Sequence, residues 1–283
     1  MSVITFVNSI KEETGKTMSL AAIATHMAIE YNNKILIIST TNKEGKLKSC
    51  FFEDKEIKKF RLGIFGNNNK SLIDGGNGIE GLVRVARSNK LTPEMITNYT
   101  RVVFKDRLEI LLGVEENQNN NEKEIAEEYV DLINVANMYY DKVFVDLDNN
   151  LDEQIRQQIV DESDLVIVNT SQNYNSLKKL KEKKEKSELL KSPKSLILVG
   201  KYDKYSKYNS KNITRFLEEK NQVLTIPYNT LYFEATNEAG VPDLFLSLRK
   251  TIDSEDRNAI FIEEIKRASE NIIYRLQELQ TII

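Results

Sequence analysis

The sequence predicts an α/β domain, with a doubly wound, mostly parallel β-sheet and helices on both faces. Short apolar runs rich in β-branched residues alternate with amphipathic helical stretches along nearly all of the 283 residues. This alternation is typical of strands that are buried on both faces. An apolar content of 40% is ample for a buried core. Because the alternation is continuous and shows no internal repeat, we expect one domain over residues 1–283.

The predicted strands are short, apolar and rich in valine, isoleucine and leucine. They cover 2–7, 34–39, 61–65, 108–112, 142–146, 165–169, 195–199 and 223–226. The predicted helices have apolar residues three and four positions apart. They cover 16–31, 78–88, 93–98, 122–139, 151–162, 175–190 and 211–219. Two polar stretches, 66–78 and 115–121, are predicted loops.

The C-terminal stretch 258–283 repeats apolar residues at helical spacing, which predicts an amphipathic helix. Such a helix could lie on a membrane surface, but its polar face mixes Glu263 and Glu264 with Lys266 and Arg267. Anionic lipid would gain little from such a mixed face. We therefore expect this helix to pack on its own domain or on a partner, and peripheral membrane contact is not favoured.

Charge and cysteine content narrow the classes of function. The net charge is −3, from 40 basic and 43 acidic residues, so bulk charge gives no attraction to DNA or anionic lipid. A single cysteine forms no internal disulfide, and the first residues lack a secretory signal. No apolar run approaches the ~20 residues that cross a bilayer. These features predict a cytoplasmic protein. The lysine-rich run 178–186 is predicted to be a solvated helix face, with a DNA or lipid contact as the alternative.

The stretch VNSIKEETGKTMSL, residues 7–20, lies where a phosphate site is expected, after the first strand and at the start of the first helix. The N–H groups at such a helix terminus face an anion. Lys16 is placed to reach the β- and γ-phosphates of a nucleotide, and the Thr17 hydroxyl to bind Mg²⁺. The ordinary Walker motif has a glycine five residues before Gly15, where this chain has Ile10. The standard motif is therefore absent.

The segment Lys11-Glu12-Glu13-Thr14-Gly15-Lys16-Thr17 resembles the deviant Lys-Gly-Gly-x-Gly-Lys-Thr loop of the MinD/ParA superfamily of dimeric ATPases. KVFVDLDNN, residues 142–150, resembles the Walker B strand of that superfamily, with Asp146 at its end. The resemblance implies a homodimer that uses ATP and Mg²⁺, with Lys11 reaching the nucleotide of the partner. The implied catalytic residues are Lys11 and Asp146, and the implied Mg²⁺ ligands are Thr17 and Asp146. The implied nucleotide-binding residues are Lys11, Thr14, Gly15, Lys16, Thr17, Met18, Pro227 and Tyr228.

Three further segments, 76–113, 199–213 and 226–241, resemble the TadZ/CpaE branch, which localises pilus-secretion machinery at the cell pole. This resemblance implies a localisation or assembly factor with pilus or secretion partners, at the pole or on the membrane through those partners. Two alternatives stay open. One is a ParA-type DNA-partition ATPase, which the near-neutral charge disfavours, and the other is a pseudoenzyme scaffold that dimerises without nucleotide.

The departures from the superfamily motif weaken the expected chemistry. Glu12 and Glu13 replace glycines that permit positive φ, and a strained non-glycine residue costs roughly 1–3 kcal/mol. A carboxylate at ~6 Å from a phosphate charge repels it by about 3 kcal/mol at an effective dielectric constant of ~20. Lys11, Lys16 and Mg²⁺ oppose this repulsion, so we expect weakened binding of ATP.

Hydrolysis is expected to be slow or absent. The superfamily places a water-orienting carboxylate after the second strand, where this chain has Ser39-Thr40-Thr41-Asn42-Lys43. Losing such a group costs orders of magnitude in rate. Asp148 and Asp152 follow the Walker B strand and are the candidates that could replace it, although loop acids are more often solvated.

Three weaker features have structural explanations that we favour over functional ones. His26 is expected to be a helix-face or core histidine rather than a metal ligand. Cys50 is not expected to be a nucleophile, because it has no paired base. The tyrosines at 202, 205 and 208, which alternate with lysines, are expected in a polar surface loop rather than stacked on bases.

Gly200 stands where the superfamily usually has an asparagine that recognises the base.

Overall fold

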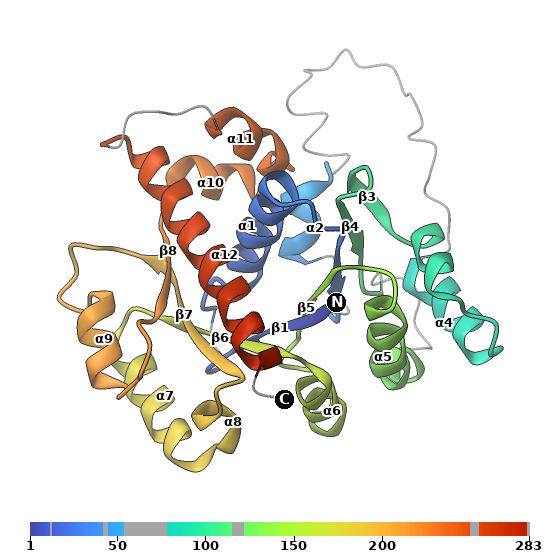
Figure 1. The fold of residues 1–283 in the computed structure, drawn as a ribbon, viewed down its shortest axis with the longest axis horizontal. Helices are drawn as coiled ribbons and strands as arrows, with labels where there is room; N and C mark the ends of the chain where they lie inside the picture. Colours follow the sequence, from blue (N-terminus) through green and yellow to red (C-terminus); the bar gives the residue numbers. More distant parts are fainter. Residues whose placement is uncertain (12, 42–44, 54–77, 115–121, 250–254, 282–283) are drawn as a thin grey trace.

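The computed structural model describes residues 1–11, 13–41, 45–53, 78–114, 122–249 and 255–281. Within these ranges eight strands form one sheet in the order β3-β4-β2-β5-β1-β6-β7-β8 (Figure 1). The strands are β1 (Ser2–Asn8), β2 (Ile35–Ser39), β3 (Arg101–Phe104), β4 (Leu108–Leu111), β5 (Lys142–Asp146), β6 (Leu165–Ser171), β7 (Ser195–Tyr202) and β8 (Leu224–Pro227).

Helices connect the strands and cover both faces of the sheet. They are α1 (Lys16–Glu30), α2 (Lys46–Phe51), α4 (Gly78–Arg87), the 3₁₀ helix η1 (Pro93–Asn98), α5 (Glu122–Asn137), α6 (Glu153–Glu162), α7 (Tyr174–Lys186), α8 (Glu188–Lys191), α9 (Ser210–Phe216), α10 (Thr230–Ala235), α11 (Val241–Leu248) and α12 (Arg257–Thr281). The doubly wound α/β class predicted from the sequence is confirmed, and among the described pairs only β3 and β4 run antiparallel.

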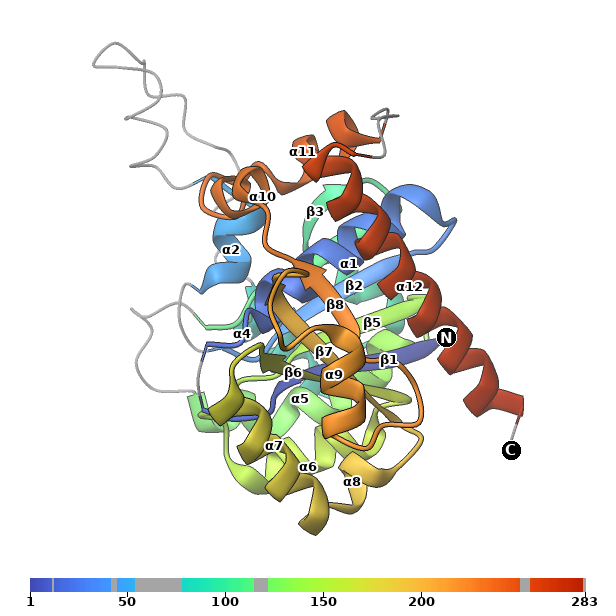
Figure 2. The ribbon, with the colours of Figure 1, turned by 90° about the vertical axis from the view of Figure 1, so that its left-hand side faces the viewer.

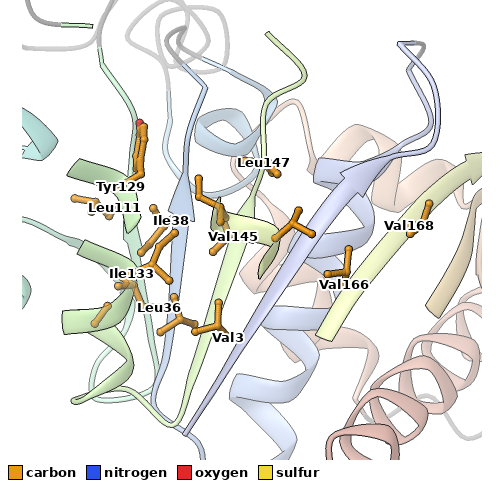
Figure 3. Packing of buried hydrophobic residues seen from close by; sticks show 14 of the residues in the cluster. Val3, Leu36, Ile38, Leu111, Tyr129, Ile133, Val145, Leu147, Val166 and Val168 are labelled. Atoms are coloured by element: carbon orange, nitrogen blue, oxygen red, sulfur yellow. The ribbon is translucent and has the colours of Figure 1, made fainter. Parts of the chain in front are cut away.

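Two apolar clusters lie on opposite faces of the sheet, because successive strand side chains point to opposite sides. Ile4 and Phe6 of β1 pack with α1, α2, α10, α11 and α12. Val3 packs on the other face with α4 to α9. Figure 2 shows α11 and α12 on one side of the sheet and α6, α7 and α8 on the other. Figure 3 shows the second cluster, in which Val3, Leu36 and Val145 lie on the side of the sheet that α5 covers with Tyr129 and Ile133.

Parallel pairing brings the carboxyl ends of the central strands to one edge. Asp146 of β5 is in register with Phe6 of β1 and with Ser39 of β2. Asn8 of β1 is in register with Asn169 of β6. Ligands of open α/β sheets bind at this edge, outside the carboxyl ends of the strands.

Several elements differ from the sequence-based prediction. The predicted helix 175–190 divides at Ser187, whose hydroxyl accepts a hydrogen bond from Leu190 N and caps α8. The short elements α2, β3, α10 and α11 were not predicted. The predicted strand 61–65, nearly all of the loop 66–78 and the loop 115–121 lie outside the described residues.

The C-terminal helix α12 crosses β8 and packs along α1 (Figure 1). Its buried side chains include Phe261, Ile265, Ile272 and Leu276. The Phe261 ring lies 4.9 Å from that of Tyr232 and 6.1 Å from that of Phe245, measured between centroids. The apolar face of α12 is therefore used within the chain. In the part of the chain that the structure describes, no helix has the length and apolarity needed to cross a bilayer.

Candidate functional site

The loop between β1 and α1 turns back on the strand that precedes it. Gly15 stands immediately before α1 with φ 80° and ψ 17°, in the left-handed region that glycine adopts without steric cost. The Thr14 hydroxyl donates to Asn8 Oδ1 over 2.5 Å. The first N–H groups of an α-helix have no intrahelical acceptor. The start of α1 therefore presents donors at the carboxyl edge of the sheet.

Three predicted site residues meet at the end of β5. Lys16 Nζ lies 2.8 Å from Asp146 Oδ1 and also donates to the carbonyl oxygen of Leu147. The Thr17 hydroxyl donates to Asp146 Oδ2 over 2.8 Å. The Lys16 and Asp146 side chains are 8% and 3% exposed, so this is a buried ion pair. Besides this ion pair, Asp146 Oδ1 has no hydrogen-bond partner among the described residues, and a carboxylate oxygen can accept from more than one group, so it keeps capacity for another partner.

The donor set fits a magnesium ion. A hydroxyl oxygen and a carboxylate lie side by side, both are ligands that Mg²⁺ accepts, and one carboxylate oxygen lacks a hydrogen bond. Among the described residues no group of three or more His, Cys, Asp or Glu side chains could hold a metal. A metal here would therefore take most of its ligands from water and phosphate, as Mg²⁺ usually does in nucleotide sites.

The remaining predicted site residues lie around this centre. Lys11 and Glu13 are on the surface, and Glu12 is outside the described residues. The carbonyl of Met18 accepts a 2.6 Å hydrogen bond from the Tyr232 hydroxyl of α10. Pro227 ends β8, and Tyr228 N donates to Tyr202 O over 3.0 Å. Tyr228 is 56% exposed.

Two residues of β7, Gly200 and Lys201, lie beside the loop. The sequence indicated only that Gly200 stands where the superfamily usually has a base-recognising asparagine, and it did not predict this contact with the loop. A Cβ atom added to Gly200 would lie 2.4 Å from the carbonyl oxygen of Thr14, so only glycine fits there. Lys201 has φ 52°, a conformation that costs a non-glycine residue on the order of 1–3 kcal/mol. A glycine within an apolar strand is a signal of close backbone approach, and Gly200 carries that signal.

The two acids considered as replacements for the missing carboxylate have structural roles. Asp152 Oδ1 accepts hydrogen bonds from Gln154 N and Ile155 N and caps α6. Asp148 Oδ1 accepts from Asn150 N over 3.0 Å. Asp148 N in turn donates to the Thr40 hydroxyl over 2.9 Å, which joins the segment after β5 to the segment after β2.

The features for which we favoured structural explanations are mostly embedded in the fold. His26 is 5% exposed, and burial lowers its pKa to about 4. Burial raises the pKa of the Cys50 thiol to about 12, so the thiolate is not accessible near neutral pH. Tyr202 is buried and its hydroxyl accepts from Ser210 N, whereas Tyr205 is 86% exposed.

Part of the lysine-rich run on α7 is neutralised within the chain. Lys181 Nζ lies 2.7 Å from Glu218 Oε1, and Lys184 Nζ lies 2.5 Å from Glu219 Oε1. Opposite charges from the end of α9 thus reduce the positive field of this helix face. These pairs fit the prediction of a solvated helix face.

No family model matches the sequence, and no curated protein matches it. Several solved structures, however, superpose on this chain. A ParA family ATPase from Chlorobium tepidum superposes with a TM-score of 0.63 at 16% identity, covering 92% of this chain and 95% of that one. The septum site-determining protein MinD of Pyrococcus horikoshii, complexed with Mg-ADP, gives 0.61 at 16% identity, with 97% and 98% covered.

A putative plasmid partition protein of Borrelia burgdorferi, bound to AMPPNP, gives a TM-score of 0.55 at 16% identity, with 99% of this chain and 98% of that chain covered. Identities at this level establish the fold and nothing finer. The chain has the fold of the MinD and ParA ATPases.

Proposed function

We propose that this protein binds ATP with Mg²⁺ at residues 14–18 and Asp146, and that it acts as a dimeric localisation or assembly factor with weak or no ATP hydrolysis. One observation carries the proposal. Lys16 and Thr17, at the start of α1, converge on Asp146 at the end of β5, beside a left-handed Gly15. A cation, a hydroxyl and a carboxylate at the mouth of a helix terminus form a site for a metal-bound polyphosphate.

Each of these side chains has a role in the proposed complex. Mg²⁺, when bound, neutralises charge on the phosphates. Thr17 and Asp146 would hold it through their oxygens. Lys16 would exchange its contact with Asp146 for the phosphates, so part of the binding energy is spent on opening a buried ion pair. This exchange adds to the weakening expected from Glu12 and Glu13, and we propose only moderate affinity.

Slow hydrolysis follows from the segment after β2. Ser39, Thr40 and Thr41 offer hydroxyls but no carboxylate, and the Thr40 hydroxyl is already bonded to Asp148 N. An attacking water would have no strong general base among these side chains. Asp148 and Asp152 are engaged in local hydrogen bonds, which further supports a slow or inactive ATPase.

The proposed dimer uses the surface around Lys11, which is exposed and lies on the loop itself. A side chain there is free to reach a nucleotide on a second copy. The pilus or secretion role rests on the sequence resemblance of segments 76–113, 199–213 and 226–241. The net charge of −3 and the neutralised lysines of α7 favour this role over DNA partition.

Calorimetry tests the nucleotide site directly. ATP with Mg²⁺ is titrated into the wild type, Lys16→Ala and Thr17→Val, with Lys178→Ala as an exposed control on α7. We expect both site variants to weaken binding at least tenfold and the control to match the wild type. Circular dichroism checks that each variant is folded. Equal affinity in all four proteins contradicts the proposal.

Light scattering distinguishes two of the proposed classes, and binding of duplex DNA tests the third. A nucleotide-dependent dimer that fails to form in Lys11→Ala supports the MinD/ParA-like factor, whereas a dimer that ignores ATP and Mg²⁺ indicates a scaffold. A DNA-partition ATPase would instead bind duplex in the presence of ATP, with affinity falling steeply as salt rises.

A further inference from the structure

We propose that Lys201 is an additional phosphate-binding residue of the nucleotide site, contributed by β7 rather than by the loop. This inference rests on the proposed function, because it assigns one more group to the same site. It also explains why a lysine stands next to Gly200, at the position where base recognition was expected from the resemblance.

The first step is the contact between β7 and the loop. A Cβ atom on Gly200 would lie 2.4 Å from Thr14 O and 3.4 Å from Ser19 Oγ. The backbone of β7 at Gly200 thus lies directly against the main chain of the loop at Thr14, and near the Ser19 hydroxyl of α1. Residues next to Gly200 are held beside the loop by main-chain contact, and their position does not depend on flexible side chains.

The second step is the direction of the Lys201 side chain. A Cβ atom placed on Gly15 would meet Lys201 Cγ at 3.6 Å and Cε at 3.8 Å. The aliphatic part of the lysine therefore runs across Gly15, the residue that starts α1. The ammonium nitrogen is bonded directly to Cε over about 1.5 Å, so it also lies near Gly15. The backbone of Lys201 has a positive φ of 52°, which is uncommon for a non-glycine residue. Such strained conformations occur often at functional sites.

The third step is the charge that this side chain carries. Lys201 is exposed, and within the described ranges no hydrogen bond or ion pair involves its ammonium group. Lys16, by contrast, is held by Asp146 and Leu147. The loop also has glutamates at 12 and 13 where glycine amides would otherwise approach an anion. A second cation beside Gly15 would attract a ligand that carries several negative charges. It would thereby offset both the engagement of Lys16 by Asp146 and the repulsion from the two glutamates.

The charge of Lys201 favours a ligand with several negative charges, such as the di- or triphosphate group of a nucleotide. An exposed ammonium group acts through long-range attraction, which grows with the charge of the ligand and is screened by salt. A neutral ligand would gain nothing from it. Lys201 is thus expected to strengthen binding of ATP without contributing to the metal site of Thr17 and Asp146.

The test compares Lys201→Met, Lys201→Arg and Lys204→Met by calorimetry with ATP and Mg²⁺ at low and high salt. Methionine keeps the apolar stem across Gly15 and removes the charge. Lys204 is an exposed lysine in the turn that follows β7, three residues after Lys201, and serves as the matched control. We expect Lys201→Met to weaken binding roughly 3–10-fold at low salt and less at high salt, with arginine restoring affinity and Lys204→Met unchanged.

A second comparison excludes a role in neutralising the loop itself. Glu13 is exposed nearby in sequence, and Lys201 could act by cancelling its charge rather than by binding phosphate. If Lys201 binds phosphate, Lys201→Met weakens binding by a similar factor in a Glu13→Gln background. Loss of the effect in that background overturns the proposal, and so does equal affinity of Lys201→Met and wild type. If the wild type binds no ATP, the proposed function fails and the role of Lys201 fails with it. If ATP binding is weakened by Lys16→Ala but unchanged by Lys201→Met, only the inference about Lys201 is contradicted.

Discussion

The ammonium nitrogen of Lys16 lies 2.8 Å from Asp146 Oδ1, with both side chains almost fully buried. The two groups come from the start of α1 and the end of β5, so this pair links the first helix to the carboxyl edge of the sheet. Both are also the groups that a magnesium-bound phosphate would need. Under the proposed function, the same charges would serve two competing purposes, an ion pair within the chain and the binding of a ligand.

Breaking this pair is expected to be costly. Removing one partner of a buried ion pair leaves an uncompensated charge, which typically costs about 3–5 kcal/mol. Lys16→Met should lower the free energy of unfolding by roughly that amount, measured by urea denaturation. The double variant Lys16→Met/Asp146→Leu should lose less than the sum of the two single variants. Strict additivity would contradict a coupled pair.

Gly200→Ala tests the contact between β7 and the loop. The new methyl group would lie 2.4 Å from Thr14 O, where main chain must move. We expect a loss of roughly 1–3 kcal/mol in stability and a clear loss of ATP affinity. Gly78→Ala is the control, since a Cβ atom there meets nothing within 4 Å. If Gly200→Ala binds ATP as the wild type does, the loop does not depend on this contact.

His26 is expected to make stability depend on pH. Burial lowers its pKa from 6.5 to about 4, opposed by Glu30 and assisted by Lys266. Between these values the unfolded chain binds more protons than the folded one, so stability is complete above pH 6.5 and falls as the pH drops towards 4. The shift corresponds to roughly 3 kcal/mol.

The measurement is urea denaturation of wild type and His26→Leu from pH 7 to pH 4.5. His26 is the only histidine, so the difference between the two proteins isolates it. We expect the wild type to lose more stability than the variant over this interval. Parallel curves would show that His26 titrates normally in the folded state.

The docking of α12 is expected to depend on Phe261. This side chain is fully buried against Tyr232 and Phe245, and removing a buried phenylalanine side chain typically costs about 3–5 kcal/mol. Phe261→Ala should show that loss in thermal or urea unfolding. Tyr274, on the same helix but 61% exposed, provides the control, because Tyr274→Ala should change stability by less than about 0.5 kcal/mol. Equal effects of the two substitutions would mean that α12 is not docked by this face.

The fold class could be predicted from the sequence because strands that are buried on both faces consist of continuous apolar residues. Such runs, alternating with amphipathic helical segments, are recognisable without knowledge of the structure. The runs that became β1, β5 and β6 were assigned to within about two residues, since their side chains are buried on both sides of the sheet. The short elements α2 and β3 were missed. The six residues of α2 are too few for a helical repeat to be recognised, and β3 is a partly exposed edge strand that lacks the buried apolar run by which β5 was identified.

The candidate site was only partly predictable. Lys16, Thr17 and Asp146 were predicted from motif positions, and the structure brings their side chains within hydrogen-bond distance. The approach of Gly200 to Thr14 was not, because it depends on how far β7 extends past its predicted end at Val199. Asp152 could have been predicted as a helix cap, since it directly precedes the first turn of α6.

A crystal structure grown in excess ATP and Mg²⁺ tests the central claim most directly. The account predicts phosphates at the start of α1, a metal beside Thr17 and Asp146, and the Lys16 ammonium turned from Asp146 to the phosphates. A structure that retains the 2.8 Å contact of Lys16 with Asp146 and holds no nucleotide would contradict it.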